Sequence, residues 1–320
     1  MTDALQALKV FGVACIVAIL GSILSAVVYP AFRRLIAGCD PAIRSLVIVC
    51  YGLVSPAVAA TVVALVMHPH FSQLLIPGHC HSGACGTHVP VINMSSVGGL
   101  VLVAGGPLFL IAVFAAGIPG IRSAHRRLRT LFGIAQTEGN RGFLIVESAE
   151  LFAWCCGIWR TKILVSSGLL KQLSQAQLQM VLAHERAHER RMDNLRVLAL
   201  RWLTACWPSA LRSRIRADLA SDIEQACDLE AAGPIDSRDS YIVVLKKMQR
   251  NRSIMASGGR AAAFGCSKTR ERIRALVRGP DHYRSITIAV LALLGLCSAE
   301  VIAVTGLTHV VVEWLSSLGV

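Results

Sequence analysis

Four long apolar runs are the feature that most constrains the fold of this chain. They cover roughly residues 10–30, 45–67, 96–118 and 285–307. Runs of this length, about 20 residues or slightly more, are enough for a helix to cross a hydrocarbon layer of ~30 Å. The first run is too long for a secretory signal peptide, and its leading segment carries only Lys9 as a basic residue. The sequence therefore predicts four transmembrane helices, the first of them a retained anchor.

The distribution of charge predicts the orientation of these helices. The chain has 320 residues, a mean hydropathy of +0.58 and a net charge of +13. Residues 119–284 hold 28 of its 32 Lys and Arg residues, whereas residues 68–95 hold none. The short segment 31–44 carries three arginines. Because basic segments between spans stay in the cytoplasm, we expect residues 119–284 to be cytoplasmic and both termini to lie outside.

The basic residues also bear on the partners of the protein. Many are arginines close to the two membrane boundaries of the long inner segment, namely Arg122, Arg126, Arg127 and Arg129 before it and Arg270 to Arg284 after it. Such a juxtamembrane cluster is attracted to anionic lipid. No nucleic-acid-binding motif accompanies the cluster. We therefore expect membrane lipid as a partner and no direct binding of nucleic acid.

These features divide the chain into three expected regions. Residues 1–118 form a three-span transmembrane region, residues 119–284 a cytoplasmic domain, and residues 285–320 a fourth transmembrane helix with a short external tail. Within the domain, GFLIVES and TKILVS are rich in β-forming residues and predict short strands. Ser174 and Gln177 form a capping-box pattern ahead of a helical pattern. The expected fold class is an α-helical membrane protein with four transmembrane helices and an inserted α+β domain.

The helical pattern contains the sequence VLAHERAHERRMDN, residues 181–194. His184 and His188 lie one turn apart and share a face of the helix. Two imidazoles in this arrangement can hold one zinc ion, and zinc lowers the pKa of bound water to about 7. Glu185 lies beside them and can accept a proton as general base. The alternative is a charged helix face with two ordinary histidines.

A zinc site of this kind needs a third protein ligand. The metzincin extension is excluded, because Arg191 and Asn194 stand where that class has Gly and His. A later predicted helix, LASDIEQACDLEAAG, residues 219–233, offers carboxylates instead. Glu224 can complete a His/His/Glu site, and Asp228, four residues on, can accept a hydrogen bond from a ligand imidazole. The alternative is that both are solvated surface acids.

The two motifs together resemble a known family. VLAHERAHERRMDN followed by IEQACDLEAA is similar to the receptor metallopeptidases of the BlaR/MecR type, which are integral-membrane zinc peptidases that signal by cleaving a transcriptional repressor. The segment FAWCCGIWRTKILVSSGLLKQLSQAQLQMVLAHE resembles the strand, turn and leading helix of that family.

The resemblance implies an integral protein of a bacterial inner (plasma) membrane, with an α+β zincin-like (gluzincin) metallopeptidase domain and one Zn²⁺. It assigns His184, His188 and Glu224 as ligands, Glu185 as general base and Asp228 as the residue that orients a ligand. It also implies a protein substrate, a cytoplasmic repressor, that pairs with an edge strand around residues 159–165.

The chain departs from the family members that sense β-lactams. It ends at Val320, about a dozen residues beyond the fourth apolar run, and lacks the S-x-x-K nucleophile of a penicillin-binding sensor there. We therefore expect a short form without that sensor. A second class of relatives, the membrane quality-control peptidases of the HtpX and CAAX-processing type, also combines H-E-x-x-H with a later Glu and remains an alternative.

Residues 68–95, on the expected outer side, are rich in histidine and cysteine. Candidate ligands there are His79, Cys80, His81, Cys85 and His88. Clusters of imidazole and thiolate bind copper or zinc, so this loop is a candidate sensor for an external metal ion. A disulfide between Cys80 and Cys85 is the simpler interpretation in an oxidising compartment. A third functional hypothesis follows, in which the protein is a metal-sensing receptor without enzymatic activity.

Overall fold

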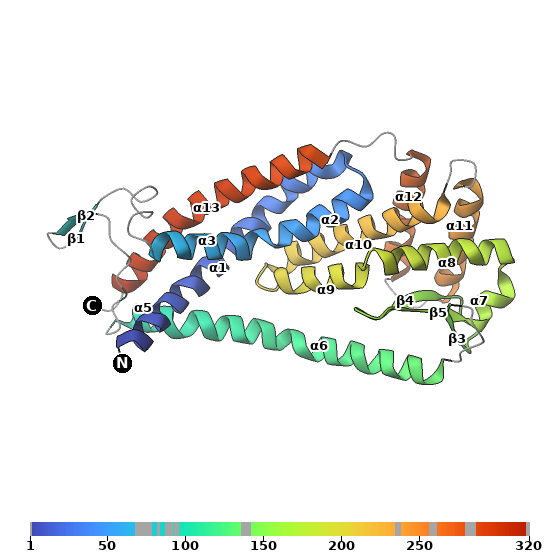
Figure 1. Ribbon diagram of the computed structural model, residues 1–320, viewed down its shortest axis with the longest axis horizontal. Coiled ribbons are helices and arrows are strands. Elements are labelled where there is room, and N and C mark those ends of the chain that lie inside the picture. Colours follow the sequence, from blue (N-terminus) through green and yellow to red (C-terminus); the bar gives the residue numbers. More distant parts are fainter. Residues whose placement is uncertain are drawn as a thin grey trace.

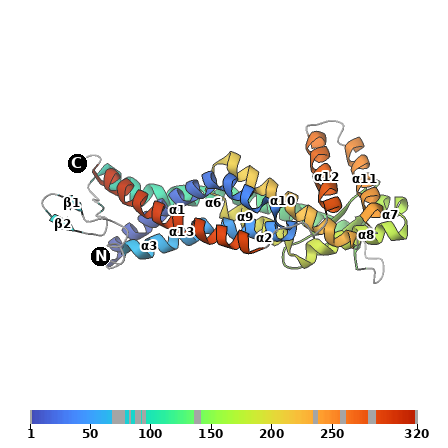
Figure 2. The same ribbon diagram turned by 90° about the horizontal axis from the view of Figure 1, so that it is seen from above.

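The computed structural model describes residues 2–67, 79–81, 84–86, 92, 96–135, 142–233, 238–255, 261–278 and 286–317. The molecule is elongated, as two perpendicular views show (Figure 1, Figure 2). The two termini and a small hairpin lie at one end, and a sheet with its surrounding helices lies at the other. The described chain is mostly helical, as the sequence predicts.

The described residues include four helical segments that are long and apolar enough to cross a membrane, as the sequence predicts, and we call them the apolar bundle. Their bounds are Ala7–Gly38, Pro41–Leu65, Val97–Ile134 and Ile286–Val312. The helices that form them are α1 (Thr2–Leu35), the 3-10 turn η1 (Ile36–Gly38), α2 (Pro41–Gly52), α3 (Val54–Met67), α5 (Val97–Leu100), the π-helical stretch η2 (Val101–Gly105), α6 (Gly106–Ile134) and α13 (Ile286–Ser317). The expected domain boundary at residue 118 falls inside α6, so one continuous helix leads from the third apolar segment into the following domain.

The second apolar segment is divided into two helices at Leu53. Pro56 has no backbone N–H, and its ring excludes a helical hydrogen bond to the carbonyl of Gly52. Helix α2 therefore ends at Gly52, and Leu53 N–H donates to Cys50 O at 3.0 Å instead. The absence of a side chain on Gly52 also matters, because a Cβ there would lie 2.9 Å from Leu200 Cδ1 of a following helix.

Polar contacts inside the apolar bundle connect its helices. Ser25 of α1 donates a hydrogen bond of 2.7 Å to Glu300 of α13, and the Tyr51 hydroxyl of α2 donates to Ser25 O at 2.7 Å. Glu300 is buried in this contact. By contrast, many large apolar side chains of α6 and α13 are exposed.

The segment between α6 and α13 contains a three-stranded sheet and six helices among its described residues. They are β3 (Leu144–Val146), β4 (Ala153–Cys156), β5 (Lys162–Ser166), α7 (Ser167–Gln172), α8 (Gln175–Arg190), α9 (Asp193–Leu203), α10 (Ser209–Ala232), α11 (Arg238–Met255) and α12 (Ala261–Arg278). Strands β3 and β5 confirm the two strands predicted from GFLIVES and TKILVS, whereas β4 lies in the intervening stretch.

The order of the strands corrects the expected substrate edge. Strand β5 lies in the centre, parallel to β3 and antiparallel to β4. The prediction that residues 159–165 form the edge was wrong, because both sides of β5 are already paired. The edge strand beside the histidine helix α8 is β4. A single sequence shows which segments favour strands, but the order of strands depends on packing between distant segments.

Helices cover both faces of the sheet. On one face, Ile163 and Val165 pack with Val181 and Leu182 of α8. On the other face, Leu164 and its buried neighbours pack against Leu128, Leu131 and Phe132 at the end of α6. Alternation along β5 sends its side chains to these two faces in turn. The long helix from the apolar bundle is therefore also part of the core of the sheet domain.

A buried ionic cluster joins the apolar bundle to α10. Asp222 of α10 is fully buried and accepts hydrogen bonds from Arg33 of α1, at 2.6 and 2.9 Å, and from Arg44 Nε of α2, at 2.9 Å. Arg44 also donates to Gln225 at 2.9 Å. The segment between α1 and α2 therefore packs directly against α10, whereas the cytoplasmic orientation expected from the charge pattern stays a prediction.

The structure describes only part of residues 68–95, the histidine- and cysteine-rich segment. Strands β1 (His79–His81) and β2 (Ala84–Gly86) pair antiparallel, with Cys80 opposite Cys85. Directly opposite residues of an antiparallel pair have Cα atoms about 4.5–5.5 Å apart, a separation that a disulfide accepts. A disulfide between Cys80 and Cys85 stays a prediction, because the backbone register alone does not test it. His88 lies outside the described residues, and metal binding by this loop stays a prediction.

Candidate active site

Helix α8 supports the first three candidate residues. It begins with the predicted capping box, in which Ser174 and Gln177 each accept from the other's backbone N–H at 3.3 Å. Leu178, Val181 and Leu182 are buried against the sheet. The same packing turns His184, Glu185 and His188 towards the interior of the domain, where they meet the edge strand β4 and helix α10.

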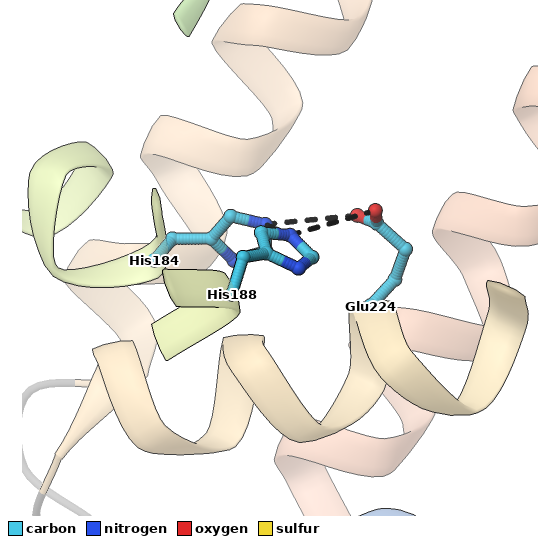
Figure 3. Close-up of side chains that lie close together, drawn as sticks. All are labelled: His184, His188 and Glu224. Atoms are coloured by element: carbon cyan, nitrogen blue, oxygen red, sulfur yellow. Dashed lines mark hydrogen bonds and ion pairs between the residues drawn. The ribbon is translucent and has the colours of Figure 1, made fainter. Parts of the chain in front are cut away.

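His184, His188 and Glu224 converge on one point (Figure 3). The two Nε2 atoms are 3.1 Å apart. Glu224 reaches them from α10, with carboxylate oxygens 3.7 Å from His184 Nε2 and 3.8 Å from His188 Nε2. The Glu224 side chain is 39% exposed, so the site opens to solvent on its side. The structure thus brings together the three residues that the sequence nominates as ligands.

Each imidazole has a carboxylate beside its Nδ1 atom, and this carboxylate orients the ring. His184 Nδ1 is 3.1 Å from Asp228 Oδ1, and His188 Nδ1 is 3.0 Å from Asp193 Oδ2. Both carboxylates are buried. A proton on Nδ1 that is shared with a carboxylate leaves Nε2 as an acceptor, so both free lone pairs point towards Glu224. Asp228 stands where the sequence places it, whereas the role of Asp193 was not predicted.

A tight turn between α8 and α9 brings Asp193 back to His188. Met192 has a left-handed conformation with φ 53°, the only positive φ of a non-glycine residue in the described chain. This conformation costs an L-residue roughly 1–2 kcal/mol. The turn interrupts the helix between Arg190 and Asp193, and it places Asp193 Oδ2 3.0 Å from His188 Nδ1. The strain is thus located where it positions a side chain of the site.

Asp228 is held by two further residues. Arg272 of α12 donates to its two oxygens at 2.6 and 2.5 Å, and the Tyr241 hydroxyl of α11 donates at 2.8 Å. Burial opposes the charge on Asp228, but the bonds from Arg272 prevail and lower its pKa to about 2. Arg272 Nη1 also contacts Glu224 at 2.8 Å. One guanidinium therefore holds both carboxylates of α10 that face the histidines.

Glu185, the residue after His184, lies against the edge strand β4. Its Oε2 accepts a hydrogen bond of 2.7 Å from the backbone N–H of Cys155 in β4. Burial raises the pKa of Glu185, although the neighbouring His184 and His188 act in the other direction. A carboxylate with a raised pKa is better matched to accepting and returning a proton near neutral pH. This position suits the general-base role.

Asn194, the next residue after Asp193, fixes the edge strand. Its side-chain amide donates to Cys155 O at 3.0 Å and to Gly157 O at 2.8 Å. Gly157 has φ +106°, which a residue with a side chain rarely adopts, and it begins the turn from β4 to β5. These hydrogen bonds therefore connect the start of helix α9, just after the turn that follows α8, to the edge strand β4, which Glu185 also contacts.

The donor set fits a zinc ion. Two imidazole Nε2 lone pairs and a carboxylate converge, and the carboxylates behind them leave both Nε2 atoms as acceptors. Their separations of 3.1–3.8 Å bracket the ~3.3 Å expected between tetrahedral ligands at Zn–N distances of about 2.0–2.1 Å. A site with three protein ligands is typical of catalytic rather than structural zinc. His184, His188 and Glu224 would hold the ion.

Cys227 forms a second group with His188 and Asp193, whose ligand atoms also lie close together. Its Sγ is 3.3 Å from Asp193 Oδ2 and 3.4 Å from His188 Nδ1. Burial raises the pKa of this thiol, as does the adjacent Asp193 carboxylate. A neutral thiol is a poor ligand, so we assign this group to the orientation of His188 and not to a second metal.

A histidine pair, a glutamate from a later helix and a glutamate beside the first histidine define a metallopeptidase-type site. Residues 120–278 match the model of peptidase family M48. The match supports an M48 family metallopeptidase and therefore a hydrolase, and zinc is the general metal of that family. No curated protein and no solved structure matches the chain at a significant level.

Proposed function

We propose that the protein is a zinc endopeptidase of the inner membrane, with a zincin-like domain whose active site faces the cytoplasm. The observation that carries the proposal is the convergence of His184, His188 and Glu224 beside a buried Glu185. The apolar bundle supports a membrane location, and the buried pairing of Arg33 and Arg44 with α10 supports a common side for the first loop and the domain.

Peptide hydrolysis at this site would use a zinc ion, Glu185 as base and the carboxylates that orient the two imidazoles. Zinc, when bound, supplies a Lewis acid that favours ionisation of water and polarises the scissile carbonyl. Glu185 accepts the proton of the attacking water and returns it to the leaving amine. Asp228 and Asp193 keep His184 and His188 in the tautomer that presents Nε2. Arg272 holds Glu224 and Asp228 in register along α10.

The substrate would bind as an extended strand beside β4. This is the edge strand next to Glu185, and peptidases commonly bind peptides by strand addition. Trp154, in the same strand, is 40% exposed and offers an apolar contact to a substrate side chain. Trp154→Ala should therefore raise KM more than it lowers kcat, whereas a change in kcat alone would argue against this position for the substrate.

The test of the activity uses Glu185→Gln in the full-length protein in detergent. The variant should bind one zinc per chain like the wild type and lose at least about a hundredfold in peptide hydrolysis. Glu189→Gln is the matched control, because Glu189 lies one turn further along α8 and is exposed. Retained cleavage by Glu185→Gln would refute the assignment of the base, and absence of zinc from both proteins would refute the metal site.

For the substrate, we propose a cytoplasmic transcriptional repressor that is cleaved in signalling. The observation that favours a receptor is the Asp222 cluster, which connects α1 and α2 directly to the helix that carries Glu224. The alternative is a quality-control peptidase of the HtpX or CAAX-processing type. Comparing the proteomes of cells with wild type and with Glu185→Gln separates the two. Accumulation of one uncut repressor supports signalling, and accumulation of many membrane-protein fragments supports quality control.

A further inference from the structure

The turn between α9 and α10 lies among the helices of the apolar bundle. The Trp207 ring packs against Tyr29 of α1 and Tyr51 of α2, each with a centroid distance of 6.0 Å. On the other side, Trp202 stacks on Phe114 of α6 at 5.4 Å. The α9–α10 hairpin is therefore held between α1 and α2 on one side and α6 on the other.

The hairpin reaches the level at which the apolar runs give way to basic residues. Tyr29 lies one helical turn before Arg33. A Cβ on Gly120 of α6 would lie 2.5 Å from Arg201 Nη2, so Arg201 packs directly on the backbone there. Arg122, two residues further, is the first basic residue after the third apolar run. Tyr and Trp at such a boundary are typical of the headgroup layer of a membrane.

Three arginines surround this turn. Arg216 Nη2 donates to Arg201 O at 2.9 Å, and Arg212 Nη1 donates to Ala205 O at 2.9 Å. Burial and the like charges of Arg212 and Arg201 lower the pKa of Arg216. No carboxylate of the described chain forms an ion pair with any of the three. Arg216 Nη2 also lies 3.4 Å from the Thr204 hydroxyl oxygen. These neutral acceptors use some of the N–H groups but balance none of the three positive charges.

The unused donors are consistent with an anionic ligand. Arg216 Nε is buried and has no hydrogen-bond partner. The described structure also gives the Arg201 guanidinium no hydrogen bond to the protein. Guanidinium groups bind phosphate oxygens in bidentate fashion, so three of them at one turn can enclose a single phosphate.

The neighbouring surface indicates where the phosphate comes from. Helix α6, which contacts both Trp202 and Arg201, exposes a row of large apolar side chains on one face, Leu108, Ile111, Phe114 and Ile118. Acyl chains would cover this row while the headgroup lies at the arginines. A soluble phosphate compound would leave the row uncovered.

We propose that Arg201, Arg212 and Arg216 form a binding site for the headgroup phosphate of an anionic phospholipid, whose acyl chains lie along α6. The site rests on the proposed membrane location but not on the proposed peptidase activity. It is distinct from the exposed arginines of α6, which attract lipid only through diffuse charge.

The test measures lipid retention by the full-length protein in detergent, by native mass spectrometry. Phosphatidylglycerol and phosphatidylcholine with identical acyl chains are the probes. The wild type should retain phosphatidylglycerol in preference to phosphatidylcholine, and R201Q/R212Q/R216Q should bind it about a hundredfold more weakly. The control R126Q/R127Q/R129Q removes equal charge from the exposed face of α6 and should change binding less than about threefold.

A single substitution tests the site even if the triple variant does not fold. Arg201→Gln removes a charge without removing a described hydrogen bond, and it should weaken phosphatidylglycerol binding by about fivefold. Equal losses in the α6 control, or no loss in Arg201→Gln and the triple variant, would overturn the site. Displacement of the lipid by millimolar inorganic phosphate would overturn the lipid as ligand. Release of the wild type from membranes without detergent would instead refute the membrane location.

Discussion

Replacing Asp228 by Asn tests the site most directly, because this residue serves both the fold and the metal. Its carboxylate is fully buried, lies 3.1 Å from His184 Nδ1 and accepts two hydrogen bonds from Arg272. An amide keeps the shape of the side chain but removes its charge. Its NH₂ group can also face Nδ1, where it would reverse the tautomer of His184.

The size of the effect follows from these contacts. Removing one partner of a buried ion pair costs about 3–5 kcal/mol, because the other charge stays buried and unpaired. Arg272 retains Glu224 at 2.8 Å, so we expect about 3 kcal/mol, at the lower end. The apparent melting temperature should fall by roughly 5–10 °C. Loss of the group that orients a ligand histidine should weaken zinc binding about 10–100-fold.

Two measurements on the full-length protein in detergent separate these effects. Thermal unfolding in excess chelator isolates the ion pair, because bound zinc would otherwise add its own stabilisation. Titration against a chelator of known affinity then gives the zinc affinity. Glu230→Gln is the matched control on the same helix, since Glu230 pairs with Arg190 at the surface and such pairs contribute about 0–1 kcal/mol.

The two possible failures have different meanings. Zinc binding by Asp228→Asn within about twofold of the wild type would refute the orientation of His184 by Asp228. An unchanged melting temperature in chelator would show that Arg272 does not depend on Asp228 for its burial.

Three further predictions follow from other contacts. Asp193→Ala should weaken zinc binding about 10–100-fold in the same titration, because His188 loses its orienting carboxylate, and unchanged affinity would contradict this role. Asp222→Asn should lower the free energy of unfolding by about 3–5 kcal/mol in chelator, since two arginines lose a buried partner, and a neutral effect would show that solvent compensates them. The pKa of Asp228 is lowered from 3.8 to about 2. Its pairing with Arg272 therefore stabilises the fold fully above about pH 4, and this stabilisation is lost as the pH falls through about 2. Acid unfolding in chelator should show this loss in the wild type and not in Asp228→Asn.

Local patterns predicted the helices and the first part of the site. Hydropathy over about 20 residues located the apolar segments, and a spacing of four residues on one helix was enough to place His184 beside His188. The capping box at Ser174 was also predictable, because both of its partners lie within one turn. Glu224 and Asp228 could be nominated from their own spacing, but the sequence left open the alternative of solvated acids.

The remaining parts of the site depend on contacts between distant segments. Asp193 lies only five residues from His188, yet it reaches the imidazole through a left-handed turn at Met192 that no pattern in the sequence announces. Arg272 follows Asp228 by 44 residues, and Arg33 precedes Asp222 by 189. The choice of β4 as the edge strand likewise depends on how β3 and β5 pair.

The features that the sequence predicts and those that only the tertiary structure decides differ for a physical reason. The sequence by itself determined the apolar segments, the helix that carries the histidine pair and the nominated third ligand, because hydropathy and helical periodicity act over a few turns. Only the tertiary structure decided which carboxylates orient the imidazoles, which strand forms the edge beside the histidine helix and which arginines remain without a carboxylate partner among the described residues. Those features arise from the pairing of buried charges and strands, and any one of several acids or arginines could have formed each pair until the packing of the whole chain selected one.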